Sequence, residues 1–130
     1  MATRATRTRS RRPGRRGESA VDRIGIRERV RRLVAALGSN QAAEILGVSR
    51  SQPSRWKSGH ERPSSAHLKA VTDLDYVMAR LLQTFPPAVA QVWLTSSNAH
   101  LGARPIDVLK LRGPAAVITA IDAEDAGAHA

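Results

Sequence analysis

The run from Ser39 to Ser58, SNQAAEILGVSRSQPSRWKS, leaves this chain few choices of fold. Its spacing predicts two short helices that cross at a steep angle, because Ala43 is small where they cross and Gly47 permits a sharp bend between them. Three apolar side chains are spaced to hold the two helices together: Leu46, Val48 and Trp56. The pattern is typical of a helix-turn-helix. The alternative is a plain helical hairpin built with the same small residues.

A helix-turn-helix places its second helix in the major groove, so the motif predicts duplex operator DNA as a partner. Side chains near the start of that helix, expected over residues 50–58 with Ser49 as its cap, would face base edges. Arg50 and Arg55 are candidate readers of guanine O6 and N7, unless both contact only phosphate. The predicted DNA-binding set also includes Ser51, Gln52 and Ser54 beside these readers, and Asn40, Gln41, Lys57 and His60 for contacts to the DNA backbone.

Pro53 departs from the pattern, because a β-branched aliphatic residue is expected at this position to pack against the first helix. As the fourth residue of a helix, a proline removes one backbone hydrogen bond. The alternative is that the helix starts later, toward Ser51. The sequence leaves the register of the second helix open between the two.

The positive charge is confined to the first half of the chain. Residues 1–62 contain 16 lysines and arginines against 5 acidic residues, whereas residues 63–130 contain 5 against 6. Seven arginines fall within the first seventeen residues, among few apolar side chains, which predicts a disordered arm over residues 1–20. Such an arm would release counterions from phosphates or place an arginine in a narrow minor groove. The alternatives are a solvated tail without a defined contact, or residues upstream of the true start.

Composition argues against an enzyme. The chain has no cysteine, which removes disulfides, thiolate zinc sites and cysteine nucleophiles. Its four histidines lack metalloprotease spacing, and we find neither a nucleophile elbow nor a phosphate-binding glycine loop. No apolar run approaches the ~20 residues of a membrane span. We therefore expect a non-enzymatic, cytoplasmic protein without a metal, a cofactor or a membrane contact.

Two amphipathic helices flank the central motif. Apolar residues at helical spacing predict one over Arg23–Leu37, which Gly38 ends. A second apolar stripe, from Leu68 to Phe85, predicts a helix of about 20 residues that Pro86 and Pro87 end. Such a stripe is core within one chain or the seam of a homodimer, which a helix-turn-helix needs to reach two half-sites, and we expect a mixture of the two in which the role within one chain is the larger.

Prolines and glycines divide the rest of the chain into short helices, one of which starts at Pro105. Each needs neighbours to bury its large apolar side chains: Trp93, Leu94, Leu101, Ile106, Leu109, Val117, Ile118 and Ile121. The predicted fold is all-α. After the arm, it has a helix-turn-helix domain over residues 21–63, and a long helix with a small helical half over residues 64–130.

The second half carries a resemblance to a known family. Its motif consists of Trp93-Leu94, Asn98, Leu101-Gly102, Arg104-Pro105 and Val108-Leu109. This motif resembles the C-terminal toxin-binding domain of Xre/ParS-type antitoxins, the partners of RES-domain toxins, and the first half is similar to their Xre-like helix-turn-helix. The resemblance covers roughly residues 23–125. Family members commonly have a second glycine where this chain has Ala103, which bears on the conformation of the loop.

The resemblance implies a type II antitoxin. Such a protein neutralises a NAD-consuming RES toxin by binding at its active site and represses its own operon through the helix-turn-helix. We expect a homodimer within a hetero-oligomeric complex. The alternative is a free-standing dimeric repressor whose C-terminal half only dimerises, and an adjacent reading frame for a RES-like toxin would distinguish the two.

Five polar residues are predicted to bind the toxin. Asp122, Glu124 and Asp125 lie among small residues near the end of the chain, and a pocket for NAD phosphates should be electropositive. We hypothesise that a flexible tail places these carboxylates in that pocket, the alternative being a frayed tail without contacts. Asn98 and Arg104 complete the set, and arginine is enriched at interfaces. For these two, the alternatives are a local cap and a solvated charge.

Overall fold

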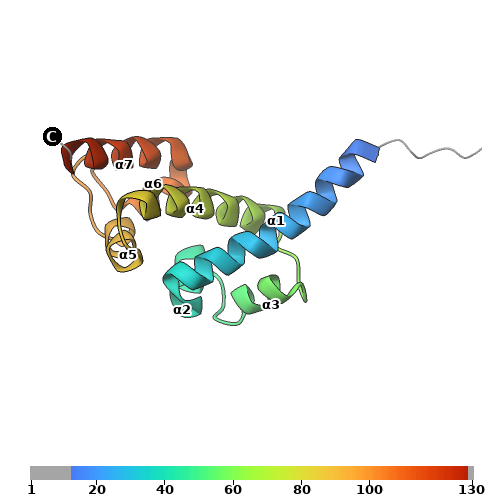
Figure 1. Ribbon diagram of the computed structural model, residues 1–130. Helices are drawn as coiled ribbons and strands as arrows, with labels where there is room; N and C mark the ends of the chain where they lie inside the picture. Colours follow the sequence, from blue (N-terminus) through green and yellow to red (C-terminus); the bar gives the residue numbers. More distant parts are fainter. Residues whose placement is uncertain (1–12, 129–130) are drawn as a thin grey trace, which may run out of the picture.

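The computed structural model describes the backbone of residues 13–128 and the side chains of residues 25–127. This part of the chain forms seven helices (Figure 1): α1 (Pro13–Leu37), α2 (Ser39–Leu46), α3 (Gln52–Ser58), α4 (Ser65–Thr84), α5 (Pro87–Thr95), α6 (Pro105–Arg112) and α7 (Pro114–Ala128). The predicted all-α class is confirmed. Residues 1–12 of the predicted arm lie outside the described residues.

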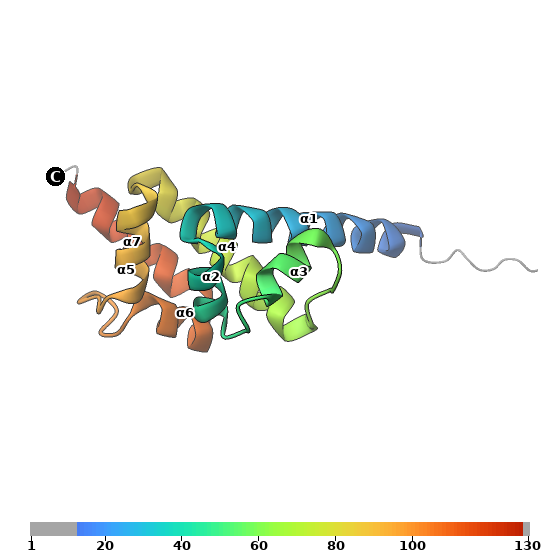
Figure 2. The same cartoon turned by 90° about the horizontal axis from the view of Figure 1, so that it is seen from below.

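Helix α1 begins at Pro13, well ahead of the start at Arg23 that the apolar stripe predicts. A proline fits the first turn of a helix, where its missing N–H has no partner to lose. The stripe shows only where the helix packs, so it gives no signal for turns beyond the core. Figures 1 and 2 show those N-terminal turns extending past the other helices.

Helix α4 lies at the centre of the molecule and packs against α1 on one side and α7 on another (Figure 2). Ser64 caps it by accepting the N–H of His67. The predicted stripe is buried within the single chain through Val71, Leu74, Val77, Met78 and Leu81. These five side chains therefore form core within one chain and not the seam of a dimer. A second copy would have to contact other residues.

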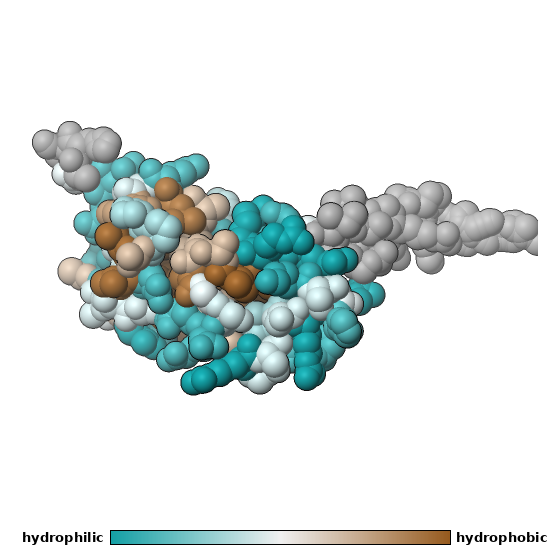
Figure 3. Space-filling view, turned by 60° about the horizontal axis from the view of Figure 1, so that its bottom comes forward, coloured by the Kyte–Doolittle hydropathy of each residue, from teal (hydrophilic) through white to brown (hydrophobic). Residues whose placement is uncertain are grey.

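Helices α5, α6 and α7 form a cluster against α4, as predicted. Their buried apolar residues include Leu94, Ile106, Leu109, Val117 and Ile121, and they join the side chains of α1 and α4 in one continuous core. Trp93, Leu101 and Ile118, also expected to be buried, are only partly so. On the face drawn in Figure 3, apolar residues gather toward the end of the molecule that lies away from the N-terminal turns of α1.

A buried carboxylate ties α1 to α4. Asp75 is only 4% exposed, and it accepts hydrogen bonds from Arg29 Nη1 at 3.0 Å and Arg32 Nε at 3.1 Å. The hydrogen bond from Arg32 to Asp75 raises the pKa of Arg32, so this guanidinium stays charged. Arg29 and Arg32 of α1 are therefore not simply solvated charges. Together with Asp75 they form an ionic cluster between α1 and α4.

Gly47 and Gly25 offer a matched pair of substitutions, because a Cβ at either position would meet no atom within 4 Å. Gly47 has a φ of +72°, whereas Gly25 lies inside α1. We expect Gly47→Ala to lower the free energy of unfolding by about 1 kcal/mol through backbone strain. Gly25→Ala should raise it by roughly 0.5–1 kcal/mol through helix propensity. Urea denaturation measures both, and effects of the same sign would contradict this account.

Candidate functional site

Helices α2 and α3 are joined by the tight turn that the sequence predicts. Gly47 adopts the left-handed conformation, and the N–H of Val48 donates to Ala43 O at 2.9 Å, which closes the end of α2. Ala43 is buried against its neighbours, and Trp56 of α3 is buried beneath the turn. Of the three residues expected to hold the two short helices, Trp56 is buried and Leu46 and Val48 are partly buried, and α1 packs against both helices.

Pro53 lies at the second position of α3, because the helix begins at Gln52 with Ser51 as its N-cap. The predicted start at Arg50, with Ser49 as the cap, is wrong, and the later start is confirmed. At this position the missing N–H has no acceptor in the helix, so the proline costs no hydrogen bond. Its ring is fully buried, in the place where an aliphatic side chain is expected.

The structure places most of the predicted base-reading residues on the surface at the start of α3. Arg50, Ser51, Ser54 and Arg55 are exposed, and Gln52 is half-buried. Arg55 Nη1 and Gln52 Nε2 each lie 3.2 Å from Glu61 Oε1. Glu61 follows α3, so the structure brings one predicted reader, Arg55, and its neighbour Gln52 to a carboxylate that the motif does not include.

The residues predicted to contact the DNA backbone are more dispersed. Asn40 is exposed in the first turn of α2, and Gln41 beside it is half-buried. Lys57 is half-buried near the end of α3, and its carbonyl oxygen accepts a hydrogen bond from Arg27 Nε at 3.2 Å. Arg27 thus crosses from α1 to the C-terminal end of α3. No sequence pattern indicates this contact, because it joins residues thirty positions apart.

The histidines of this region have separate partners. His60 Nδ1 lies 3.0 Å from Ser58 Oγ, and His67 Nδ1 lies 3.2 Å from Ser64 Oγ. The ring of His67 also packs at an angle against Trp56, with 5.3 Å between ring centroids. Among the described residues, no three histidines or carboxylates are grouped to hold a metal ion. None of the helices in the described range is long and apolar enough to cross a membrane.

The loop between α5 and α6 is closed by Asn98. Its Oδ1 accepts the N–H of Leu101 at 3.0 Å, and its own N–H donates to Ala103 O at 3.0 Å. The positive φ of this loop, +70°, falls on Gly102, while Ala103 pairs with Asn98 as a short bridge. Ala103 has no positive φ, so the loop does not require a second glycine at this position. In the free chain, Asn98 has the local capping role, and its contact with a toxin stays a prediction.

Arg104 is exposed and bound to a carboxylate of its own chain. Its Nε donates to Asp107 Oδ2 at 2.8 Å, and its Nη2 donates to Oδ1 at 3.0 Å. This two-point hydrogen bond lowers the pKa of Asp107 and raises that of Arg104. The guanidinium is thus held in one orientation at the start of α6, and it is not a freely solvated charge.

The predicted flexible acidic tail is wrong for the described residues. Helix α7 runs to Ala128, and Arg80 of α4 contacts Asp122 at 2.9 Å and Asp125 at 3.4 Å. Glu124 Oε1 lies 3.5 Å from Trp93 Nε1. The small residues near the end are mostly alanines, which favour a helix over a loose chain. The three carboxylates thus lie on a helix that packs against α4 and α6.

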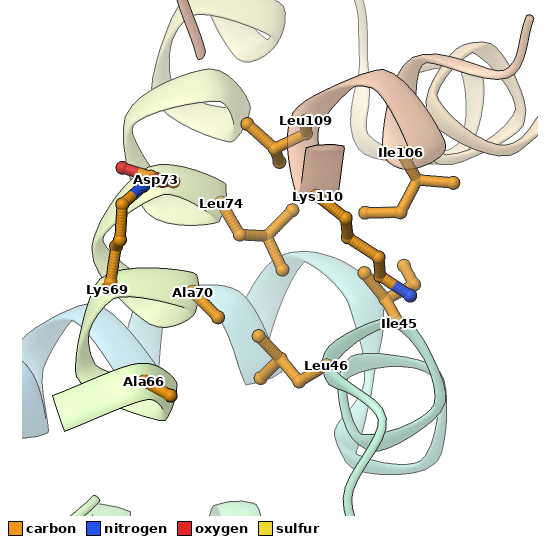
Figure 4. A pocket seen from close by; sticks show the side chains of 10 residues that line it. All are labelled: Ile45, Leu46, Ala66, Lys69, Ala70, Asp73, Leu74, Ile106, Leu109 and Lys110. Carbon is orange, nitrogen blue, oxygen red and sulfur yellow. Dashed lines mark hydrogen bonds and ion pairs between the residues drawn. The ribbon is translucent and has the colours of Figure 1, made fainter. Parts of the chain in front are cut away.

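An open cleft of about 320 Å³ lies between α2, α4 and α6 (Figure 4). Apolar side chains from all three helices line it, including Leu46, Leu74 and Ile106, and the ion pair of Lys69 and Asp73 lies at its edge. The cleft is thus located where the first and second halves of the chain meet. None of the residues predicted to bind DNA or toxin lines it.

The comparisons with known proteins identify the second half. No curated protein and no solved structure matches this chain. Residues 80–127 match the family described as the antitoxin Xre/MbcA/ParS C-terminal toxin-binding domain. The matched residues comprise the end of α4 and nearly all of the cluster formed by α5, α6 and α7. The resemblance of the second half to the C-terminal toxin-binding domain of Xre/ParS-type antitoxins is confirmed for residues 80–127.

Proposed function

We propose that this chain is the antitoxin of a type II toxin–antitoxin system. It neutralises a RES-type, NAD-consuming toxin by direct binding at the toxin's active site, and it represses its own operon through α2 and α3. The match of residues 80–127 to a toxin-binding domain carries this proposal. A free-standing repressor would have no use for such a domain.

The geometry of α2 and α3 supports the DNA-binding half of the proposal. Arg50 and Arg55 are exposed near the start of α3, where a helix that enters a major groove presents its side chains. The positive charge of the chain is concentrated in residues 1–62, which include α2 and α3. Binding to phosphates requires basic side chains beside the helix that enters the groove, and the exposed Arg50, Arg55 and Arg62 lie on α3 or next to it.

Co-expression with the protein encoded beside this gene tests the proposal. We expect that protein to arrest growth and deplete NAD when expressed alone, and this chain to restore both. The matched control is the same toxin with an empty vector. If the neighbour arrests growth and the chain gives no relief, the antitoxin function is wrong. If growth recovers without any earlier fall in NAD, the RES-type assignment of the toxin is wrong.

Substitution of the arginines tests base reading. On a panel of operator variants, we expect Arg50→Ala or Arg55→Ala to weaken binding by about 10- to 100-fold and to abolish the preference for guanine at one position, since a bidentate contact contributes about 1–3 kcal/mol of discrimination. Lys57→Ala is the control, because a phosphate contact should be lost equally on every sequence. A uniform loss for both arginine variants would show that they contact only phosphate.

A further inference from the structure

An uncharged stretch interrupts this strongly charged chain. Residues 81–103 contain no aspartate, glutamate, lysine or arginine, although these types make up 25% of the sequence. The stretch includes all of α5, which alone among the described helices has no charged side chain. It also lies inside the segment that matches the toxin-binding domain.

Helix α5 is apolar on two opposite sides. Ala90 and Leu94 are completely buried, one turn apart, and hold the helix against the core. Val89 and Val92 lie on the opposite side, 46% and 62% exposed. A surface helix normally presents charged or polar residues to water, so an outward face made of valines is unusual. We refer to Val89 and Val92 as the α5 face.

Exposed apolar side chains are concentrated in the matched segment. Of the five large apolar residues that are exposed among those described, Leu82, Val89, Val92 and Leu111 lie within residues 80–127, and only Tyr76 lies outside. Contact surfaces are depleted of charge at their centre and enriched in apolar area. The apolar end of the molecule in Figure 3 therefore has the composition of an interface.

The charges that border the uncharged stretch are already paired. Arg80 contacts Asp122 and Asp125, and Arg104 is bound by Asp107. Each of the two arginines that flank the stretch in sequence is therefore paired within the chain. A partner that covers this face meets two valines at its centre, while the carboxylate of Glu124 lies 3.5 Å from Trp93 Nε1 on the same helix.

We propose that the α5 face is the apolar centre of the toxin-binding surface, and that it fits an uncharged apolar patch on the toxin. This inference rests on the proposed function for its occupant. The toxin is favoured over a second copy of this chain because the uncharged stretch lies within the segment that matches a toxin-binding domain.

Single cysteines provide the test, because the chain has none of its own. Val92→Cys places one thiol on the α5 face, and Tyr76→Cys, 56% exposed in the wild type, places the control on α4. The rate of maleimide modification is measured for each full-length variant, alone and with the toxin encoded beside its gene. We expect the toxin to slow modification of the Val92→Cys variant at least tenfold and to leave the Tyr76→Cys variant unchanged.

Each result decides between the possibilities. If the toxin binds the chain but leaves the rate of maleimide modification unchanged at both positions, the α5 face is not part of the toxin-binding surface. The antitoxin function would remain intact. No binding of toxin to the wild-type chain would refute the proposed function itself. If modification of the Val92→Cys variant slows as the concentration of the chain alone increases, a second copy of the chain covers the α5 face. This result would overturn the proposal.

A charge substitution gives an independent measurement. Val92→Lys should weaken toxin binding by at least about 30-fold, because interface centres tolerate an unpaired charge poorly. It should leave the melting temperature and DNA binding unchanged, since lysine is well tolerated on an exposed helix face. Tyr76→Lys is the matched control and should bind toxin like the wild type. Equal losses of affinity in both variants would contradict a contact centred on α5.

Discussion

Replacing Trp56 with alanine is expected to lower the free energy of unfolding by about 3–5 kcal/mol, the cost of removing a large buried aromatic side chain. Trp56 is 2% exposed and belongs to the core that also contains residues of α1 and α4. Its ring packs against His67 at the start of α4. Neighbouring helices cannot close on the space it leaves without losing their contact with α3.

The same substitution tests whether the two halves of the chain fold together. The buried core is continuous from Ile26 to Ile121 and passes through both halves. We therefore expect one urea transition, shifted as a whole by Trp56→Ala, when unfolding is followed by circular dichroism. Ser54→Ala, an exposed change on the same helix, is the control and should alter stability by less than about 0.5 kcal/mol. Two separate transitions would contradict a shared core.

Replacing Asp75 with alanine is expected to cost about 2–3 kcal/mol. The substitution removes a buried carboxylate and its charged hydrogen bonds to Arg29 and Arg32. The loss should stay below that for a fully buried ion pair, because the side chains of Arg29 and Arg32 are 37% and 53% exposed and water can hydrate them. Urea denaturation measures the change.

Asp73→Ala provides the matched control on the same helix. Asp73 forms an ion pair with Lys69 one turn away, and such a pair contributes only about 0.2–0.5 kcal/mol. If Asp75→Ala costs no more than Asp73→Ala, the ionic cluster between α1 and α4 contributes nothing specific to stability. A further check is the variant with Arg29 and Arg32 both replaced by alanine, in which the additional effect of Asp75→Ala should change markedly.

Much of the local structure could be predicted because its causes are local. A glycine in the left-handed region ends α2 at Gly47, and a pair of prolines separates α4 from α5. The period of apolar residues placed α4 correctly. These signals act over a few residues, so they can be read along the chain. Two predictions near the ends of the chain are wrong. The apolar stripe gives no signal for the first turns of α1, and the small residues near the end of the chain predict a flexible tail where α7 is helical.

The contacts within the candidate sites could not be predicted from the sequence, because they join residues that are distant along the chain. Glu61 joins Gln52 and Arg55 because the chain turns back after α3. Arg80 binds Asp122 and Asp125 across more than forty positions. No period or spacing along the chain reports such contacts.

By itself, the sequence determined the kind of molecule: an all-α chain with two short crossed helices, a long central helix and a C-terminal motif of the antitoxin family. Backbone preferences and side-chain periodicity are properties of short segments, so they can be recognised without knowing which other helices pack against the segment. Only the tertiary structure decided which charges are paired, that the stripe of α4 is core, and that Val89 and Val92 remain uncovered. Burial depends on what packs against a side chain, and the fold alone supplies those neighbours.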